Sequence, residues 1–221
     1  MVVLVAPPNS YRTGAYVAAV QRRGLQAVVA SEGAGGVALN TGGVHLQLGA
    51  PGARDALLAA LAGRRVRGVV ATDDATVELG SAVAAALDLP HNSATAARLS
   101  RRKDLARQAL HRAALPVPGF RRLHLERDLP HAATGLRYPC VVKPLALSGS
   151  RGVIRADDPW ELLAACRRID AILAVEGRQG EEGEYVLVED YLEGVEVALE
   201  GMLRDGELTV LALFDKPEPL T

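Results

Sequence analysis

The sequence contains 221 residues, of which 49% are hydrophobic, and this is enough for one large domain or two small domains with a packed core. The formal net charge is -1. Because proteins that follow a phosphate backbone need a clustered excess of Lys and Arg, this balance argues against a nucleic-acid or polyanion binder.

The cysteines and the hydropathy pattern indicate a reducing, aqueous compartment. Cys140 and Cys166 have neither a metal-ligand spacing nor a redox spacing, so we expect two buried thiols. The amino terminus has no basic flank before an extended apolar run, and no later stretch approaches a membrane span. We therefore expect a soluble cytoplasmic protein without a nucleic-acid or membrane partner.

The first thirty residues have the pattern of a βαβ unit. Residues 2–6 predict a buried strand, residues 14–23 a helix that Gly24 ends, and residues 27–30 a second strand parallel to the first. The glycine-rich residues 33–36 resemble a dinucleotide-binding loop. They follow the second strand and open no amphipathic helix, so their context argues against that interpretation.

A second set of strands and helices continues this α/β pattern. We expect strands at residues 44–48 and 66–71 and a helix at residues 53–61, with His45 on a strand face rather than on a metal. Thr72-Asp73-Asp74 follows the last of these strands, where open α/β sheets bind ligands. An N-cap for a helix at residues 75–87 is at least as good an interpretation.

A basic helix and a proline-rich break follow. Residues 100–110 predict a helix whose charge run is ordinarily a solvated face. Residues 115–120, Leu-Pro-Val-Pro-Gly-Phe, break the helix because proline forces extended geometry on the residue before it. We place a domain boundary there.

The central feature of the second half is a predicted hairpin. Residues 138–144 form an apolar run that closes on Lys143, and a small-residue loop leads from there to Val153. Gly149 and Gly152 permit backbone torsions that let consecutive N–H groups surround phosphate oxygens, and Lys143 would add a positive charge. The alternative is an ordinary turn beside a solvated lysine.

The remaining residues predict one helix and two strands. A helix starts at residue 158, with Asp157 or Asp158 as its cap and Trp160 packed at its start, and residues 177–183 read as an exposed loop. Residues 185–194 form an apolar strand that ends on acids. Residues 195–201 alternate apolar and acidic side chains, as an antiparallel strand with one face on a polar site would.

These motifs together resemble a known superfamily. A strand lysine, a serine and glycine loop, a strand ending in Glu-x-Tyr-Leu, a Gly-x-Glu strand and a later Asp-Lys-Pro occur in the order of the ATP-grasp superfamily. The chain looks most like its carboxylate–amine ligases, the relatives of amino-acid ligases, D-alanine–D-alanine ligase and biotin carboxylase. The resemblance covers essentially the whole chain.

The resemblance implies an α/β fold in two parts. A Rossmann-like (pre-ATP-grasp) parallel-sheet domain at residues 1–90 would be followed by connecting helices at 91–118. Residues 119–221 would form a partial ATP-grasp α+β lid domain and the start of the carboxyl-terminal subdomain.

The resemblance also implies a set of ATP-binding residues. Lys103 and Lys143 would hold the phosphates, and Lys216 matches a later basic position on the phosphate side. Backbone N–H groups would form the lid over the phosphates, from Ser148, Gly149, Ser150 and Gly152. Arg151 is left open between phosphate, substrate and solvent.

Three further positions match the family's nucleoside contacts. Glu189 would accept a hydrogen bond from the adenine amino group, and the backbone of Tyr191 and Leu192 would complete that edge. Glu196 matches the family glutamate that binds the ribose hydroxyls. Without the ordered set, both glutamates would be read as solvated strand ends.

The activity that the resemblance implies is ligation. A carboxylate is a poor acyl donor, so ATP would phosphorylate it and an amine or thiol would attack the acyl phosphate, with Mg2+ and lysines neutralising the phosphate charge. The implied partners are therefore a small-molecule carboxylate and an amine. A homodimer, frequent among relatives, is left open.

One departure from the family qualifies this expectation. The sequence stops at Thr221, where the family continues with strands that supply the acidic and Asn ligands of magnesium. We therefore expect the amino-terminal and ATP-lid part of a ligase, with the Mg2+ ligands beyond Thr221 and no metal ligand within the chain. Two alternatives stay open: an ATP-binding module without catalysis of its own, or an ATP-dependent carboxylase of the biotin carboxylase or purine-biosynthesis type.

Overall fold

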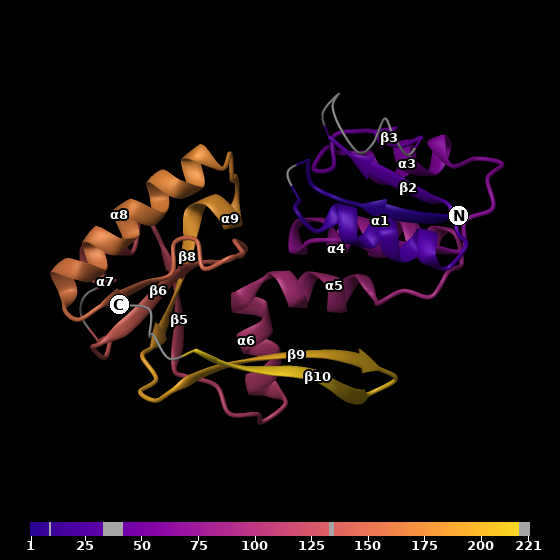
Figure 1. The fold of residues 1–221 in the computed structure, drawn as a ribbon. Coiled ribbons are helices and arrows are strands. Elements are labelled where there is room, and N and C mark those ends of the chain that lie inside the picture. Colours follow the sequence, from indigo (N-terminus) through magenta and orange to yellow (C-terminus); the bar gives the residue numbers. More distant parts are fainter. Residues whose placement is uncertain (9, 33–41, 133–134, 217–221) are drawn as a thin grey trace. The chain divides into compact units, whose positions relative to one another are not determined.

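A computed structural model of the chain describes residues 1–8, 10–32, 42–132 and 135–216. The chain folds into two compact units (Figure 1). Unit 1 contains Met1–Leu115 together with Ala146–Ser148, and unit 2 contains Pro116–Leu145 together with Gly149–Thr221.

Unit 1 is built on a parallel sheet of four strands. These are β1 (Val2–Val5), β2 (Ala27–Ser31), β3 (Val44–His45) and β4 (Gly68–Ala71), in the order β3-β2-β1-β4. The central strand β1 is apolar along its whole length because both faces of a parallel sheet are covered, and Val3, Leu4 and Val5 are fully buried.

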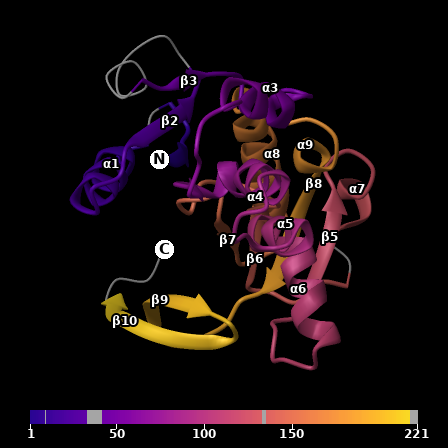
Figure 2. The ribbon, with the colours of Figure 1, turned by 90° about the vertical axis from the view of Figure 1, so that its right-hand side faces the viewer.

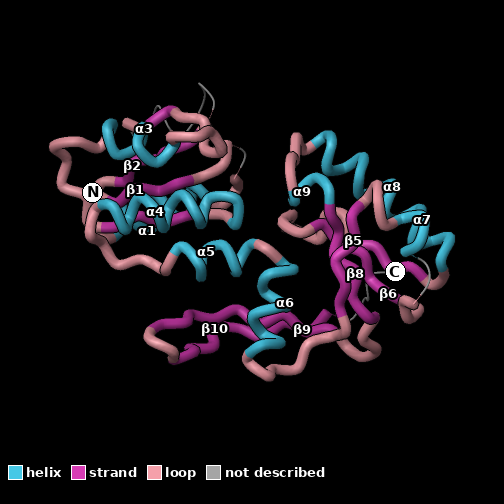
Figure 3. The backbone as a smooth tube through the Cα atoms, turned by 180° about the vertical axis from the view of Figure 1, so that it is seen from behind, coloured by secondary structure: helices cyan, strands magenta, loops and turns pink. Residues whose placement is uncertain are grey.

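Helices cover both faces of this sheet (Figure 3). On one face, α3 (Ala53–Ala60) and α4 (Val77–Ala86) pack Leu57 and Val83 against Val3 and Val5. On the other face, α1 (Thr13–Arg22) packs against Leu4 and Val29. The predicted Rossmann-like α/β arrangement is therefore confirmed.

Two helices follow the sheet in unit 1. A short 3-10 helix, η1 (Asp74–Thr76), precedes α4. After α4 come α5 (Ala94–Arg101) and α6 (Lys103–Arg112). Arg102 has extended torsions, φ -92° and ψ 104°, so the basic helix begins at Lys103 rather than at residue 100, and residues 100 and 101 end the short helix before it. Lys103 is the first residue of the second helix.

Unit 2 contains a four-stranded antiparallel sheet. Its strands are β5 (Phe120–His124), β6 (Cys140–Pro144), β7 (Ile154–Ala156) and β8 (Tyr185–Asp190), in the order β5-β8-β6-β7. The predicted hairpin is confirmed, since β6 and β7 pair directly with Val142 opposite Ile154. The short helix α7 (Leu129–Ala132) follows β5, and the short helix α9 (Glu181–Glu184) directly precedes β8.

One face of this sheet is covered by α8 (Pro159–Val175) (Figure 1). Side chains alternate along a strand, so the face that carries Cys140, Val142 and Pro144 is the buried one, and Lys143 lies on the opposite face. Asp158 caps α8 by accepting hydrogen bonds from the backbone N–H groups of Trp160 and Glu161 at 2.8 and 2.9 Å.

Both cysteines lie in this buried layer, as the sequence predicts. Burial raises the pKa of Cys140 to about 11 and that of Cys166 to about 12, because a thiolate is poorly solvated among apolar side chains. Both thiols are free.

The remaining strands of unit 2, β9 (Glu196–Arg204) and β10 (Glu207–Lys216), form a separate two-stranded antiparallel sheet (Figure 2). Its apolar side chains are largely exposed, among them Leu203, Leu211 and Leu213. The alternating strand predicted at residues 195–201 is therefore present, and it is longer than expected.

Several local expectations are wrong or lie outside the described residues. The strand expected at 44–48 contains only two residues, Trp160 is 79% exposed instead of packed, and the loop expected at 177–183 includes the start of α9. The glycine-rich residues 33–36 lie outside the described residues. None of the described helices has the length and apolar composition needed to cross a membrane.

Candidate functional site

The face of the unit 2 sheet opposite α8 carries a lysine–glutamate pair. Lys143 Nζ on β6 lies 2.5 Å from Glu189 Oε2 on β8. Strand register explains the contact, because Glu189 is opposite Val141 and is therefore a diagonal neighbour of Lys143 on the same face. The Glu189 side chain is 5% exposed and the Lys143 side chain 16%, so two opposite charges are held together largely out of water.

The loop after Lys143 has the backbone that its glycines predict. Gly149, Ser150 and Gly152 have positive φ angles of 66°, 56° and 71°. A Cβ on Gly152 would lie 2.9 Å from Cγ of Pro144, so both the torsion and the space select glycine there. The loop also contains a turn, in which the Val153 N–H donates to the Ser150 carbonyl at 3.1 Å, and turns of this kind can present backbone N–H groups to an anion.

Arg151 lies in the same loop and forms an ion pair with Glu176 at the carboxyl-terminal end of α8. Its guanidinium therefore has a contact within the unit. From the sequence, Arg151 could contact phosphate, substrate or only solvent. In the structure it contacts a glutamate of the same unit instead.

Lys103 contacts the remaining part of this loop, which belongs to unit 1. Its Nζ donates a hydrogen bond to the backbone carbonyl of Leu147 at 2.5 Å, next to Ser148. The two residues are 44 positions apart in sequence, so a lysine on a helix of the first half reaches the loop predicted to hold phosphate.

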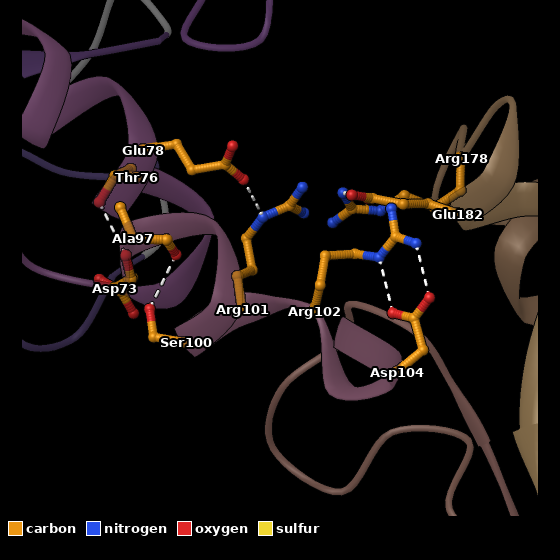
Figure 4. Close-up of polar contacts among 10 residues, drawn as sticks. All are labelled: Asp73, Thr76, Glu78, Ala97, Ser100, Arg101, Arg102, Asp104, Arg178 and Glu182. Carbon is orange, nitrogen blue, oxygen red and sulfur yellow. Dashed lines mark hydrogen bonds and ion pairs between the residues drawn. The ribbon is translucent and has the colours of Figure 1, made fainter. Parts of the chain in front are cut away.

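A buried ion pair fixes the start of the helix that carries Lys103. Arg102 donates to Asp104 through Nε and Nη2 at 2.9 and 2.8 Å, and the two side chains are 4% and 1% exposed (Figure 4). The basic run was interpreted as a solvated face, and for Arg102 this is wrong. The signal in the sequence is the aspartate two residues later, which lets a bidentate pair form around Lys103.

The backbone just after Glu189 forms a hydrogen bond to the segment that precedes β6. The Tyr191 N–H donates to the carbonyl of Pro139 at 3.3 Å, and the guanidinium of Arg155 lies 4.5 Å from the Tyr191 ring centroid. The Leu192 side chain is exposed. The structure thus places Tyr191 beside the β6–β7 hairpin.

Glu196 and Lys216 lie opposite each other. They are register partners at the end of the β9–β10 ladder and form an ion pair between Oε1 and Nζ. The sequence assigned one to ribose and the other to phosphate. Because cross-strand partners on one face are the closest neighbours in a sheet, strand pairing brings the two assigned side chains together.

A polar cluster lies at the carboxyl end of the unit 1 sheet. Asp73 Oδ2 accepts hydrogen bonds from the hydroxyls of Ser10 and Thr72 at 2.6 and 2.8 Å, and Arg12 Nη1 lies 3.6 Å from Oδ1. Asp73 occupies the N-cap position of η1 with extended torsions, although its side chain forms no capping hydrogen bond. Its backbone carbonyl accepts a hydrogen bond from the Thr76 hydroxyl at 2.8 Å (Figure 4).

The described residues do not assemble a metal site. No group of three or more His, Cys, Asp or Glu side chains among them could hold a metal ion. Glu189 and Glu196, the two carboxylates that the resemblance assigns to the nucleoside, each form an ion pair with a lysine ammonium group.

Comparison with known proteins gives one family match within the second half of the chain. Residues 136–220 match a family model described as the ATP-grasp domain. A comparison with curated protein sequences gave no match.

Solved structures share the fold of the whole chain. L-amino acid ligase from Bacillus licheniformis is 24% identical with a TM-score of 0.79, over 100% of this chain and 55% of that chain. N5-carboxyaminoimidazole synthetase from Staphylococcus aureus, complexed with ADP, is 14% identical with a TM-score of 0.73, over 98% and 55% of the two chains. Carboxyaminoimidazole ribonucleotide synthase from Aspergillus clavatus, complexed with ATP, is 15% identical with a TM-score of 0.71, over 98% and 54%.

The chain therefore spans about half the length of these solved structures. The resemblance to the ATP-grasp superfamily and the α/β fold class are confirmed.

Proposed function

We propose, on the premise that residues 136–220 form an ATP-grasp domain, that this chain is the nucleotide-binding part of an ATP-dependent carboxylate–amine ligase. The observation that supports this most is the Lys143–Glu189 pair beside the β6–β7 loop. ATP needs a cation for its phosphates and an acceptor for its adenine amino group, and these two side chains supply both.

In this proposal the pair rearranges when ATP binds. Lys143 exchanges the carboxylate of Glu189 for phosphate oxygens, and Glu189 accepts from the adenine amino group. Each charge then keeps a partner, which matters because an isolated charge at such low exposure is costly. The contact between the two side chains in the free chain is thus the resting arrangement of the site.

The loop supplies the second half of the phosphate contact. Backbone N–H groups of Gly149, Ser150 and Gly152 would donate to the terminal phosphates, and positive φ angles at these residues support that role. The resemblance also assigns Lys103 to phosphate, and its hydrogen bond to Leu147 lies within unit 1. Lys143 and the N–H groups of the loop would stabilise charge on the transferring phosphoryl group.

The proposed chemistry has two steps. A carboxylate oxygen of the substrate attacks the γ-phosphorus of ATP, the bond to the bridging oxygen breaks, and ADP and an acyl phosphate form. An amine then attacks the acyl carbon, phosphate leaves with the electron pair, and the amine loses a proton to give an amide. Mg2+ enters this proposal with ATP, as the counter-ion of its phosphates.

A carboxylase is the second candidate. Structures of carboxyaminoimidazole synthetases have TM-scores of 0.73 and 0.71 to this chain, close to the 0.79 of the amino acid ligase. Bicarbonate would then be the carboxylate that receives the phosphoryl group. The two candidates share the nucleotide site and differ in the acceptor.

Calorimetric titration of the whole chain with Mg-ATP tests the proposal, together with an assay for ADP and phosphate release in the presence of mixed amino acids or of bicarbonate. We expect saturable binding in the wild-type chain and at least tenfold weaker binding in Lys143→Met. Release that requires two amino acids supports the ligase, whereas release that requires bicarbonate supports the carboxylase. Binding without release indicates a nucleotide-binding module, and equal affinity in the folded variant rejects the proposed site.

A further inference from the structure

A basic pocket lies in unit 2, beside the edge strand β5. Its volume is about 230 Å³. The residues that line it come from β5 and from the turn into α7: Arg121, Arg122, Leu123, Arg127, Asp128 and His131. None of the residues assigned to ATP lines this pocket, and its charged side chains are three guanidinium groups and one carboxylate.

The turn after β5 is held by its own polar groups. Nδ1 of His124 accepts hydrogen bonds from the backbone N–H groups of Glu126 and Arg127 at 3.1 and 3.2 Å. Asp128 Oδ2 accepts a hydrogen bond from the backbone N–H of His124 at 2.7 Å. The only carboxylate that lines the pocket is therefore engaged by the backbone, and the turn places Arg127 at the pocket wall.

A single tyrosine positions two of the arginines. The Arg122 guanidinium lies 3.7 Å from the centroid of the Tyr185 ring and also pairs with Glu181 at 2.8 Å. Arg127 Nη2 donates to the Tyr185 hydroxyl at 3.1 Å. Because the two guanidinium groups are already ordered, a ligand that binds them loses little additional side-chain entropy.

Two of the arginines keep most of their hydrogen-bonding capacity. Within residues 1–8, 10–32, 42–132 and 135–216, no carboxylate lies within ion-pairing distance of Arg121 or Arg127. A guanidinium has five N–H donors in a planar fork, and Arg127 uses one of them on Tyr185. Such forks match the oxygen pairs of phosphate and carboxylate groups.

We propose that the pocket between β5 and α7 binds a small dianionic oxyanion, with Arg121 and Arg127 as its direct ligands and Arg122 as a fixed positive charge. The competing explanation is that the arginines only protect an exposed sheet edge from pairing with another strand. The two explanations differ in whether a saturable anion site exists. The proposal does not depend on the ligase assignment.

The test is a titration of the 15N-labelled whole chain with inorganic phosphate, and in parallel with malonate, at constant ionic strength set by KCl. We expect saturable shifts of the backbone amides of Leu123, Glu126 and Asp128. Phosphate also has access to the proposed ATP site, so shifts near Lys143 are counted separately. A Lys143→Met chain should keep the shifts around β5.

Two double variants separate the explanations. Arg121→Gln with Arg127→Gln should weaken the response around β5 at least tenfold for whichever anion saturates it. The control is Arg167→Gln with Arg168→Gln, which removes two exposed charges from α8 in the same unit and should leave the response unchanged. Shifts that grow linearly for both anions, or that decrease equally in both double variants, overturn the proposal and leave an exposed basic edge.

Discussion

Lys143 Nζ lies 2.5 Å from Glu189 Oε2, although the two residues are 46 positions apart in sequence. The antiparallel pairing of β6 with β8 sets this contact, because it places both side chains on the sheet face opposite α8. In the proposed function the same pair would link stability to nucleotide binding, because ATP would have to replace one charged partner with another.

The first prediction concerns this pair. Lys143→Met should weaken Mg-ATP binding roughly 10- to 100-fold, because a hydrogen bond to a charged group contributes about 1.5–3 kcal/mol. It should also lower the free energy of unfolding, since Glu189 loses an ammonium group at 5% exposure. Calorimetric titration and urea denaturation measure the two effects.

The matched control for this prediction is the double variant Lys143→Met with Glu189→Gln. Removing both charges should restore part of the stability that Lys143→Met loses, while leaving ATP binding weak. If the single and the double variant are equally unstable, the two charges do not interact in solution.

The second prediction compares two glycines of the same loop. Gly149→Ala and Gly152→Ala both force alanine into a left-handed torsion, which costs about 1–2 kcal/mol. A Cβ at Gly152 also lies 2.9 Å from Cγ of Pro144, whereas a Cβ at Gly149 meets no atom within 4 Å. Thermal denaturation should therefore show the larger decrease in Tm for Gly152→Ala, and equal decreases would refute the close approach to Pro144.

The third prediction concerns the junction of α5 and α6. Asp104→Ala should destabilise the chain by about 3–5 kcal/mol, because it removes a carboxylate from a guanidinium that is 4% exposed. The control is Glu78→Ala, which removes the partner of Arg101 in a pair whose side chains are 16% and 41% exposed (Figure 4). More exposed pairs contribute about 0–1 kcal/mol, so urea denaturation should separate the two variants clearly.

The fourth prediction concerns the pH dependence of the two thiols. Burial raises the pKa of Cys140 from 9.0 to about 11 and that of Cys166 to about 12, so the folded chain keeps both protons where the unfolded chain releases them. The stability from the neutral thiols is complete below pH 9 and falls as the pH rises through about 11. Urea denaturation at pH 8 and pH 10.5 should show this decrease.

Alkylation provides an independent check on the same thiols. At pH 8 iodoacetamide should modify neither cysteine in the folded chain and both in urea, because the thiolate is the reactive form and both side chains are buried. A variant with Ser at both positions should lose the fall in stability between pH 9 and 11. Rapid modification of the native protein would show that one thiol is accessible.

The sequence alone determined the features that depend on local pattern. Apolar runs, alternation and glycine placement predicted the parallel sheet of unit 1, the β6–β7 hairpin and the start of α8 at Asp158. The order of motifs predicted the ATP-grasp resemblance, which the match of residues 136–220 confirms. These features can be predicted from sequence because side-chain periodicity and backbone torsion preferences depend on only a few neighbouring residues.

Only the tertiary structure decided which of these side chains meet. Strand register joins Lys143 to Glu189 and Glu196 to Lys216, and the extended torsions of Arg102 turn a run of surface charge into a buried ion pair. Trp160 has a large apolar side chain, but it lies in the first turn of α8, which Asp158 caps, and there its side chain is exposed. Contacts between residues dozens of positions apart depend on how strands pair and helices pack, and a periodic pattern specifies which face a residue occupies but not the partner it finds there.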